Sequence, residues 1–271
     1  MMKRATIRAY GPLNDFLPSG RRQADVTVAF AGRTSVKDLL EGIGVPHPEI
    51  DLVLRNREPV AFDCAVDDGD RIAAFPRFHA VDIAGVTRVR PRPLASVRFV
   101  LDGHLGKLAR RLRLVGRDAV CPAGAVDAEL ANLADREGRI LLTRDRALLK
   151  RRVVTHGAFI RETDAHQQLV EVLQRFGPFE IAPFSRCLRC NTELREVPKS
   201  LVELSVPPRT RLQHDRFQRC LGCGRIYWQG SHWKRLACAI DAALGDASDD
   251  VSVSTSSVNS RDSSAESELD Q

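Results

Sequence analysis

The sequence predicts an α/β protein with a central parallel sheet and a smaller unit on each side of it. Three observations support this fold class. In residues 98–182, short apolar runs that end in an aspartate alternate with helical patterns. Patterns in the order β-β-α-β-β precede this region, and two Cys-x-x-Cys pairs follow it. Alternating strands and helices are typical of βαβ units, whose strands are parallel.

Length, hydropathy and cysteine content narrow the class of protein. The chain has 271 residues, of which 43% are hydrophobic, enough for two or three domains with buried cores. No apolar run approaches the ~18 residues of a membrane span. The start MMKRATIRAY has no apolar secretory core, so we expect a cytoplasmic protein. Seven cysteines, four of them in close pairs, fit a reducing compartment and a metal site.

The charge is unevenly distributed. The whole chain carries +6, but residues 245–271 contain seven acids and one arginine, which leaves +12 on the rest. A basic body favours a polyanionic partner such as RNA, although solubility alone is the simpler explanation. The Ser- and Asp-rich end has little to bury, and we predict a disordered acidic tail over 241–271.

The first 79 residues show the pattern of a β-grasp. Strand patterns at 5–11 and 24–31 precede a helix capped by Thr34, and further strand patterns follow at 52–62 and 66–76. After them, residues 80–97 show no sustained period and contain Pro91 and Pro93, which predicts a partly extended linker.

This first unit resembles the sulfur-carrier proteins of thiamine and molybdopterin synthesis, which are ubiquitin-like. The resemblance lies in Asn-x-Glu-Pro-Val at 56–60 and Asp-Gly-Asp-x-Ile at 68–72. Those carriers end in an activated Gly-Gly, whereas this chain continues as Pro-Arg-Phe-His-Ala at 76–80. We therefore expect a structural or protein-docking module that bond cleavage does not require.

The central unit offers four candidate catalytic carboxylates. Asp102 and Asp145 each follow an apolar strand pattern, while Asp127 and Asp164 open helices. Open α/β sheets bind ligands at the carboxyl edge of their strands. The simpler role for Asp127, Asp145 and Asp164 is helix N-capping, and Gln167 would complete a capping box with Asp164. Asp102 fits that role less well, because its helix starts later.

Clustered carboxylates suit phosphodiester hydrolysis. Two divalent ions about 3.5–4 Å apart can stabilise the attacking and the leaving oxygen, and carboxylates are usual ligands for such ions. The first helix has Lys107, Arg110 and Arg111 on the face opposite its apolar stripe. A solvated basic face is the commoner explanation. Because these charges border Asp102, we predict contacts with the RNA backbone, to which Arg144 would add.

The central unit resembles the PIN-like nucleases and, more closely, the Mut-seven C-terminal RNase family. This resemblance implies a metal-dependent ribonuclease that uses Mg²⁺ or Mn²⁺, with Asp102 and Asp145 in the acidic cluster and Asp127 and Asp164 beside them. The matching residues are Phe99–Asp102, Leu105–Arg110, Leu112, Arg113, Gly116, Asp127, Leu130, Ala134 and Ile140–Asp145.

The third unit, residues 183–240, contains the most specific motif. Two Cys-x-x-Cys pairs, separated by twenty-nine residues, are Cys187 with Cys190 and Cys220 with Cys223. Four thiolates predict a zinc ribbon with a structural, closed Zn²⁺ site, and a redox pair is the alternative. The insert at 206–219 is basic, and we expect it to be flexible. The remaining cysteines are single and are expected to be core thiols: Cys64, Cys121 and Cys238.

The ribbon ends in the sequence Trp-Gln-Gly-Ser-His at 228–232, and the same RNase family carries a ribbon with this kind of ending. Aromatic residues interleaved with basic ones can stack nucleobases, so Trp228, His232 and Lys234 are candidate RNA contacts. The alternative is that Trp228 and Trp233 pack a small core.

The sequence thus predicts a ribonuclease that cleaves RNA, in five segments. A different class, a non-catalytic RNA- or ribosome-binding zinc-ribbon protein, is the alternative, and a docking protein acting through the β-grasp is a third. The segments are a β-grasp at 1–79, a linker at 80–97, a PIN-like RNase domain at 98–182, a zinc ribbon at 183–240 and an acidic tail at 241–271.

Overall fold

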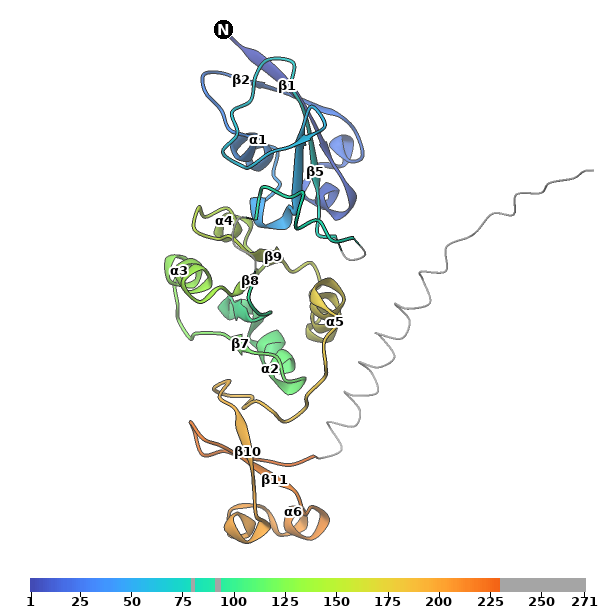
Figure 1. The fold of residues 1–271 in the computed structure, drawn as a ribbon. Coiled ribbons are helices and arrows are strands. Elements are labelled where there is room, and N and C mark those ends of the chain that lie inside the picture. The colour runs from blue at the N-terminus through green and yellow to red at the C-terminus, as the bar shows by residue number, and fades with distance from the viewer. Residues whose placement is uncertain (79–80, 91–93, 230–271) are drawn as a thin grey trace, which may run out of the picture.

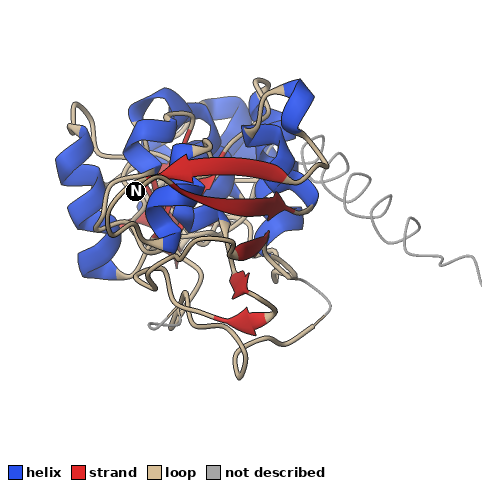
Figure 2. Cartoon of the chain, turned by 90° about the horizontal axis from the view of Figure 1, so that it is seen from above, coloured by secondary structure: helices blue, strands red, loops and turns tan. Residues whose placement is uncertain are grey.

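The computed structural model describes residues 1–78, 81–90 and 94–229. They form three units in a line (Figure 1), with the N-terminal sheet at the top and a small antiparallel sheet at the bottom. Figure 2 looks down this line from the N-terminal end, so the units overlap in it. The expected acidic tail at 241–271 lies outside the described residues, as do Pro91 and Pro93.

The N-terminal unit is the expected β-grasp. Its five-stranded sheet has the order β2-β1-β5-β3-β4, with β1 and β5 parallel and the other pairs antiparallel. Short 3₁₀ turns at Gly11–Phe16, Ser19–Arg21 and His47–Glu49 connect its elements. The elements are β1 (Lys3–Ala9), β2 (Val26–Phe30), α1 (Val36–Gly42), β3 (Leu52–Arg55), β4 (Glu58–Pro59) and β5 (Arg71–Phe75).

Helix α1 covers one face of this sheet and leaves the other face open. Ile7 of β1 and Ile72 of β5 are buried with Leu40 of the helix, as strand alternation requires. The helix begins at Ser35, which accepts the Asp38 amide while Asp38 accepts the Ser35 amide. The predicted cap at Thr34 was therefore wrong by one residue, because only Ser35 can form this reciprocal capping box.

The central unit has a four-stranded, fully parallel sheet in the order β7-β6-β8-β9. Strands and helices alternate along the chain, as the sequence predicts, with a 3₁₀ turn at Gly103–Leu105 before the first helix. The elements are β6 (Phe99–Leu101), α2 (Gly106–Leu114), β7 (Ala119–Val120), α3 (Asp127–Glu137), β8 (Ile140–Thr143), α4 (Arg146–Leu149), β9 (Gly157–Phe159) and α5 (Ala165–Phe176).

Helices cover both faces of this sheet, which explains why its strands are continuously apolar. Leu101 and Leu142 point toward α2 and α5, and Val100 and Leu141 point toward α3 and α4. All four side chains are fully buried. Figure 1 shows the two helix pairs on opposite sides of the sheet.

The C-terminal unit is a three-stranded antiparallel sheet in the order β10-β11-β12, as in a zinc ribbon. Its insert contains a short helix and most of β11, and Phe217 is buried against Val202 and Val206. Its elements are β10 (Leu194–Val197), 3₁₀ turns at Lys199–Leu201 and Glu203–Ser205, α6 (Pro208–Gln213), β11 (Phe217–Cys220) and β12 (Ile226–Tyr227).

The β-grasp covers the β9 edge of the central sheet. The buried carboxylate of Glu49 accepts the backbone N–H of Phe159 in β9 and pairs with Arg175 of α5. His47 Nε2 lies 2.7 Å from the Val154 carbonyl oxygen, and Lys150 donates to the Glu41 carbonyl over 2.7 Å. The first of these contacts satisfies the Phe159 N–H, a backbone group that an exposed edge strand would leave free.

The described part of the predicted linker also packs at this junction. Val89 is buried in the β-grasp core. Arg90 pairs with Asp51 of the β-grasp at 2.6 Å and donates to the Thr155 carbonyl of the central unit over 2.7 Å. The end of this segment, Val89 and Arg90, is thus part of the contact between the two units.

Among the described residues, no helix is both long and apolar enough to cross a bilayer.

Replacing Glu49 should weaken the whole fold. We expect Glu49→Ala to lower the free energy of unfolding by about 3–5 kcal/mol, because it leaves the Arg175 charge and an edge N–H without their partner. Urea unfolding would measure this loss. Glu58→Ala, at an exposed glutamate, should stay within about 0.5 kcal/mol of the wild type. Equal stabilities of the two variants would contradict the role of Glu49.

Candidate active site and metal centre

One candidate aspartate follows each of the four parallel strands. Asp102 comes directly after β6 and Asp145 follows β8 by two residues, while Asp127 begins α3 after β7 and Asp164 caps α5 after β9. The strand order therefore arranges them as Asp127, Asp102, Asp145 and Asp164 along one carboxyl edge. This is the edge at which open α/β sheets bind ligands.

The two middle aspartates follow the adjacent central strands β6 and β8, whereas the outer two follow the edge strands β7 and β9. Neighbouring strands lie about 4.8 Å apart, so the ends of β7 and β9 are roughly 14 Å from each other. The four carboxylates accordingly do not form one tight group. Within the described residues, the only group of three or more potential metal ligands within 4.8 Å of one another consists of cysteines.

Thr143 links the two middle positions. Its hydroxyl donates to Asp102 Oδ2 over 3.0 Å and accepts the Asp145 backbone N–H at 2.9 Å. Thr143 is fully buried at the end of β8. The half-buried carboxylate of Asp102 is thereby held toward the start of the loop that carries Asp145.

Helix N-capping, the simpler role considered for three of these aspartates, is present for two of them. Asp145 Oδ1 accepts the Ala147 N–H and caps α4. Asp164 Oδ1 accepts the amides of Gln167 and His166, and these hydrogen bonds lower the pKa of its exposed carboxyl group. The capping role is wrong for Asp127. Asp127 is the first residue inside α3, and the cap position is occupied by Val126.

Basic residues flank this edge. Lys107 and Arg110 are exposed on α2, whereas Arg111 is half-buried. Arg111 is close enough to Asp164 to help lower its pKa. Arg144, next to Asp145, uses its guanidinium to donate to the carbonyl oxygens of residues 160–162, and so holds the loop after β9.

The four predicted zinc ligands are gathered at one point. Cys187 Sγ lies 3.5 Å from Cys223 Sγ, and Cys190 Sγ lies 3.4 Å from Cys220 Sγ. All four sulfurs lie within 4.8 Å of one another. A tetrahedral Zn²⁺ with bonds of about 2.3 Å needs sulfurs roughly 3.8 Å apart. The donor set and spacing therefore fit zinc.

The two cysteine turns have matching backbones. The residue after the second cysteine has a positive φ in each: +67° at Asn191 and +72° at Gly224. The Thr192 hydroxyl lowers the pKa of Cys190 to about 6, which favours the thiolate that metals bind. Burial raises the pKa of Cys220 to about 12, a cost that a bound cation would offset.

The first cysteine turn is attached to the β7 edge of the central sheet. Asn191 accepts the Ala119 N–H at 3.1 Å and donates to Asp118 over 2.7 Å. Asp118 also accepts from Arg139 over 2.7 Å. Burial alone would raise the pKa of Asp118, but these two hydrogen bonds outweigh it and lower the pKa.

A buried arginine makes a second connection. Arg113 of α2 donates to the Ala119 carbonyl over 2.7 Å and to the carbonyls of Leu188 and Arg189 over 2.9 and 3.0 Å. The last two carbonyls lie between the cysteines of the first pair. The metal turn is thus part of the packing of the central unit.

Comparison with models of protein families shows which family the chain belongs to. The family model described as the Mut7-C RNAse domain matches residues 97–240, more than half of the chain. The chain belongs to the Mut7-C RNase family. A second model, described as Mut7-C ubiquitin, matches residues 2–82. No curated protein matches the chain.

Membership of the Mut7-C family confirms the resemblance stated from the sequence and implies a ribonuclease with RNA as its substrate. The N-terminal unit is the ubiquitin-like domain of this family rather than a sulfur carrier. The match includes the four aspartates and the four cysteines.

Several predicted side chains have other surroundings or lie outside the described residues. Trp228 is half-buried against the small core, with its ring centroid 6.5 Å from that of Phe217, which supports the packing alternative. Cys64 and Cys121 are single thiols packed partly into cores. His232, Trp233, Lys234 and Cys238 lie outside the described residues.

The sequence analysis assigned no role to Thr143, Arg113 or Asn191, although the first two are among the residues that match the RNase family. For Thr143 a signal existed, since a polar residue ends an otherwise apolar strand. Arg113 interrupts no pattern visible in the sequence, because α2 carries several arginines. Asn191 follows a cysteine pair, where a residue able to adopt positive φ is expected.

We expect one Zn²⁺ per chain on the four cysteines. Changing Cys187 and Cys220 together to serine should abolish the metal, as elemental analysis would show. It should also lower the melting temperature of the central unit, because Asn191 and the carbonyls bound by Arg113 move with the turn. The single change Cys64→Ser is the control and should retain zinc. Zinc bound by the double variant would contradict this site.

Proposed function

We propose that this Mut7-C protein hydrolyses RNA phosphodiester bonds at the carboxyl edge of its central sheet, in a reaction that depends on Mg²⁺ or Mn²⁺. The observation that carries the proposal is the hydrogen-bonded unit of Asp102, Thr143 and Asp145 at the ends of β6 and β8. A buried hydroxyl that orients a carboxylate at this edge supports the proposal, because hydrogen-bond partners of this kind position the ligands of metal sites.

Asp102 and Asp145 would hold the metal. Asp102 uses one carboxylate oxygen for Thr143, and Asp145 uses one for the α4 cap, so each has another oxygen to offer. Divalent ions, when bound, stabilise the charge that develops on the attacking and leaving oxygens. Asp127 and Asp164 flank this pair, and in the proposed site they contribute through water or by contact with a second ion.

The basic residues of α2 would hold the RNA backbone. Lys107 and Arg110 are exposed in the first half of α2, five and eight residues after Asp102, where phosphates of a strand entering the site would lie. Arg144 contributes less directly, because its guanidinium holds the loop after β9. We propose a single-stranded substrate, since stacking and backbone contacts are the usual means of binding it.

The zinc is proposed to be structural, because four thiolates leave no coordination position for water or substrate. Four thiols available to a metal also fit a reducing setting, and we propose a cytoplasmic protein.

Asp102→Asn should separate catalysis from binding. The amide keeps the size of the side chain but loses the charge that holds a divalent ion, so we expect cleavage of labelled single-stranded RNA to fall by at least about 100-fold while RNA binding persists. Asp63→Asn removes the same charge from an exposed position of the β-grasp and should cleave normally.

Thermal melting of the same preparations completes the test. A folded Asp102→Asn protein that cleaves at the wild-type rate would remove the assignment. Wild-type protein that binds RNA but cleaves none with either metal would favour the non-catalytic RNA-binding alternative.

Substitutions on α2 should impair RNA binding, in contrast to Asp102→Asn, which should impair cleavage. Lys107→Ala, Arg110→Ala and Arg111→Ala should weaken RNA binding, and each lost phosphate contact should reduce the slope of log affinity against log salt by roughly 0.7. Binding titrations at several salt concentrations would measure this. Arg152→Ala, an equal loss of charge at another exposed position of the central unit, should leave the slope unchanged. An identical reduction for Arg152 would show that only net charge matters.

A further inference from the structure

The open face of the β-grasp sheet has a hollow that the cleavage reaction does not use. It measures about 560 Å³ and lies over β1, β3 and β5, on the side that α1 leaves uncovered. All of the residues that line it belong to the β-grasp. Those that matter here are Arg8, Tyr10, Asn56, Arg57, Arg71 and Phe75.

An exposed aromatic ring stands at one end of this hollow. Tyr10 stacks on Phe75 with ring centroids 4.5 Å apart and planes only 6° from parallel, yet Tyr10 remains 41% exposed. The Arg8 guanidinium lies 5.8 Å from the centre of the Tyr10 ring. A nucleobase that stacks on the exposed part of this ring would take the place of the Arg8 guanidinium, which could then contact the neighbouring phosphate.

The charge around the ring is positive. Arg8 and Arg71 share one carboxylate, that of Asp25, at 3.8 and 2.9 Å. Arg57 is exposed and forms no ion pair with any other described residue. Three guanidinium groups against one carboxylate suit a phosphate backbone, and the combination of aromatic and basic groups is typical of sites for single-stranded nucleic acid.

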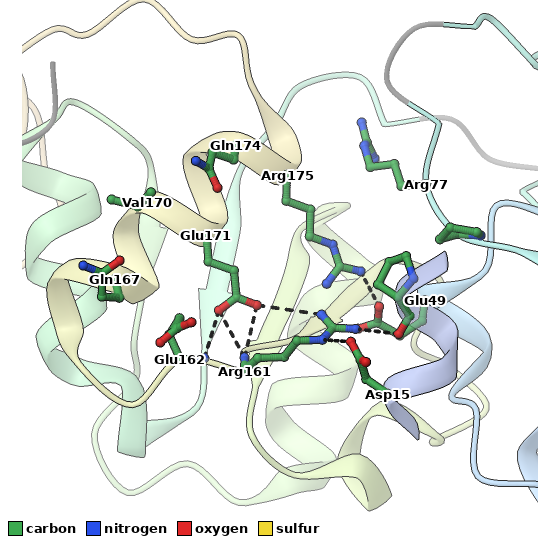
Figure 3. A pocket seen from close by; sticks show the side chains of 12 residues that line it. Asp15, Glu49, Arg77, Arg161, Glu162, Gln167, Val170, Glu171, Gln174 and Arg175 are labelled. Carbon is green, nitrogen blue, oxygen red and sulfur yellow. Dashed lines mark hydrogen bonds and ion pairs between the residues drawn. The ribbon is translucent and has the colours of Figure 1, made fainter. Parts of the chain in front are cut away.

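A second hollow, of about 380 Å³, lies between the β-grasp and α5 (Figure 3). Its lining includes Pro12 and Pro76, which follow Tyr10 and Phe75 closely in the sequence, and also Arg77. Of its four carboxylates, those of Asp15, Glu49 and Glu171 are paired with arginines of the same hollow.

The far side of the second hollow reaches the loop after β9. Arg161 and Glu162 line it, and the Arg161 carbonyl accepts a hydrogen bond from Arg144, the neighbour of Asp145. In Figure 3, Arg161 lies between Asp15 and Glu171, while Arg77 stands apart from these ion pairs. Arg77 is thus the guanidinium of the second hollow that lies outside these ion pairs, and a phosphate leaving the active edge could pair with it.

We propose that single-stranded RNA extends from the nuclease edge across the open face of the β-grasp, with a base stacked on Tyr10 and phosphates near Arg8, Arg57 and Arg77. This rests on the proposed function and adds a second binding surface to it. The ubiquitin-like domain then favours the binding of longer RNA, because only RNA long enough to span both hollows contacts it.

Binding of oligouridines of 6 and 24 nucleotides, without added Mg²⁺ or Mn²⁺, tests the proposal on the full chain. Tyr10→Ala should weaken binding of the 24-mer by at least about fivefold and leave the 6-mer unchanged, whereas Tyr10→Phe should bind both as the wild type does. Arg57→Asn should weaken binding of the 24-mer selectively, because it removes a guanidinium near the phosphates. Asparagine is chosen because it tolerates the positive φ of +77° at this position. Arg33→Asn is the control of equal charge loss.

Photocrosslinking of wild-type protein to a 24-mer with 4-thiouridine gives a readout that needs no variant, and we expect crosslinks at Tyr10 or Phe75. If Tyr10→Ala folds and binds both lengths normally while the wild type binds and cleaves RNA, this inference is overturned and the proposed function stands. The face would then be free for a protein partner. If the wild type neither binds nor cleaves RNA, both fail.

Discussion

The structure depends on how the two open edges of a four-stranded parallel sheet are covered. Edge strands expose backbone N–H groups that invite pairing with other chains. In this protein one side chain from each flanking unit supplies the missing acceptor. Glu49 of the β-grasp accepts from Phe159 in β9, and Asn191 of the cysteine turn accepts from Ala119 in β7. Three segments of very different composition therefore become one molecule.

Covering the side edges leaves the carboxyl edge as the accessible one. There the strand ends are held by packing on both faces of the sheet, and the fully buried Thr143 joins the position of Asp102 to that of Asp145. A side chain held by such a framework loses little additional freedom when a ligand binds. The outer aspartates begin or cap helices, and Asp164 uses one carboxylate oxygen for the start of α5. The hydrogen-bonded centre of this edge therefore differs from its flanks, where each aspartate belongs to a helix start.

What the sequence predicted correctly depends on local periodicity. The strands of the central sheet are short apolar runs, the β-grasp has a recognisable element order, and the paired cysteines have a fixed spacing, so all three units were found. The contacts between units follow no period. Asn191 meets Ala119 across 72 residues, and Glu49 meets Phe159 across 110. Such pairings arise from tertiary packing, and the same holds for Arg113, whose burial sets it apart from the other arginines of α2.

The two covers of the sheet differ in when they become available to a growing chain. Because synthesis runs from the N-terminus, the β-grasp that covers β9 is complete before any strand of the central sheet has been made. The cysteine turn that covers β7 is made after all of them, and the second cysteine pair comes a further thirty residues later. The β7 edge is therefore the last to be covered, and a metal held by both cysteine pairs would complete that cover only after the whole ribbon has been made.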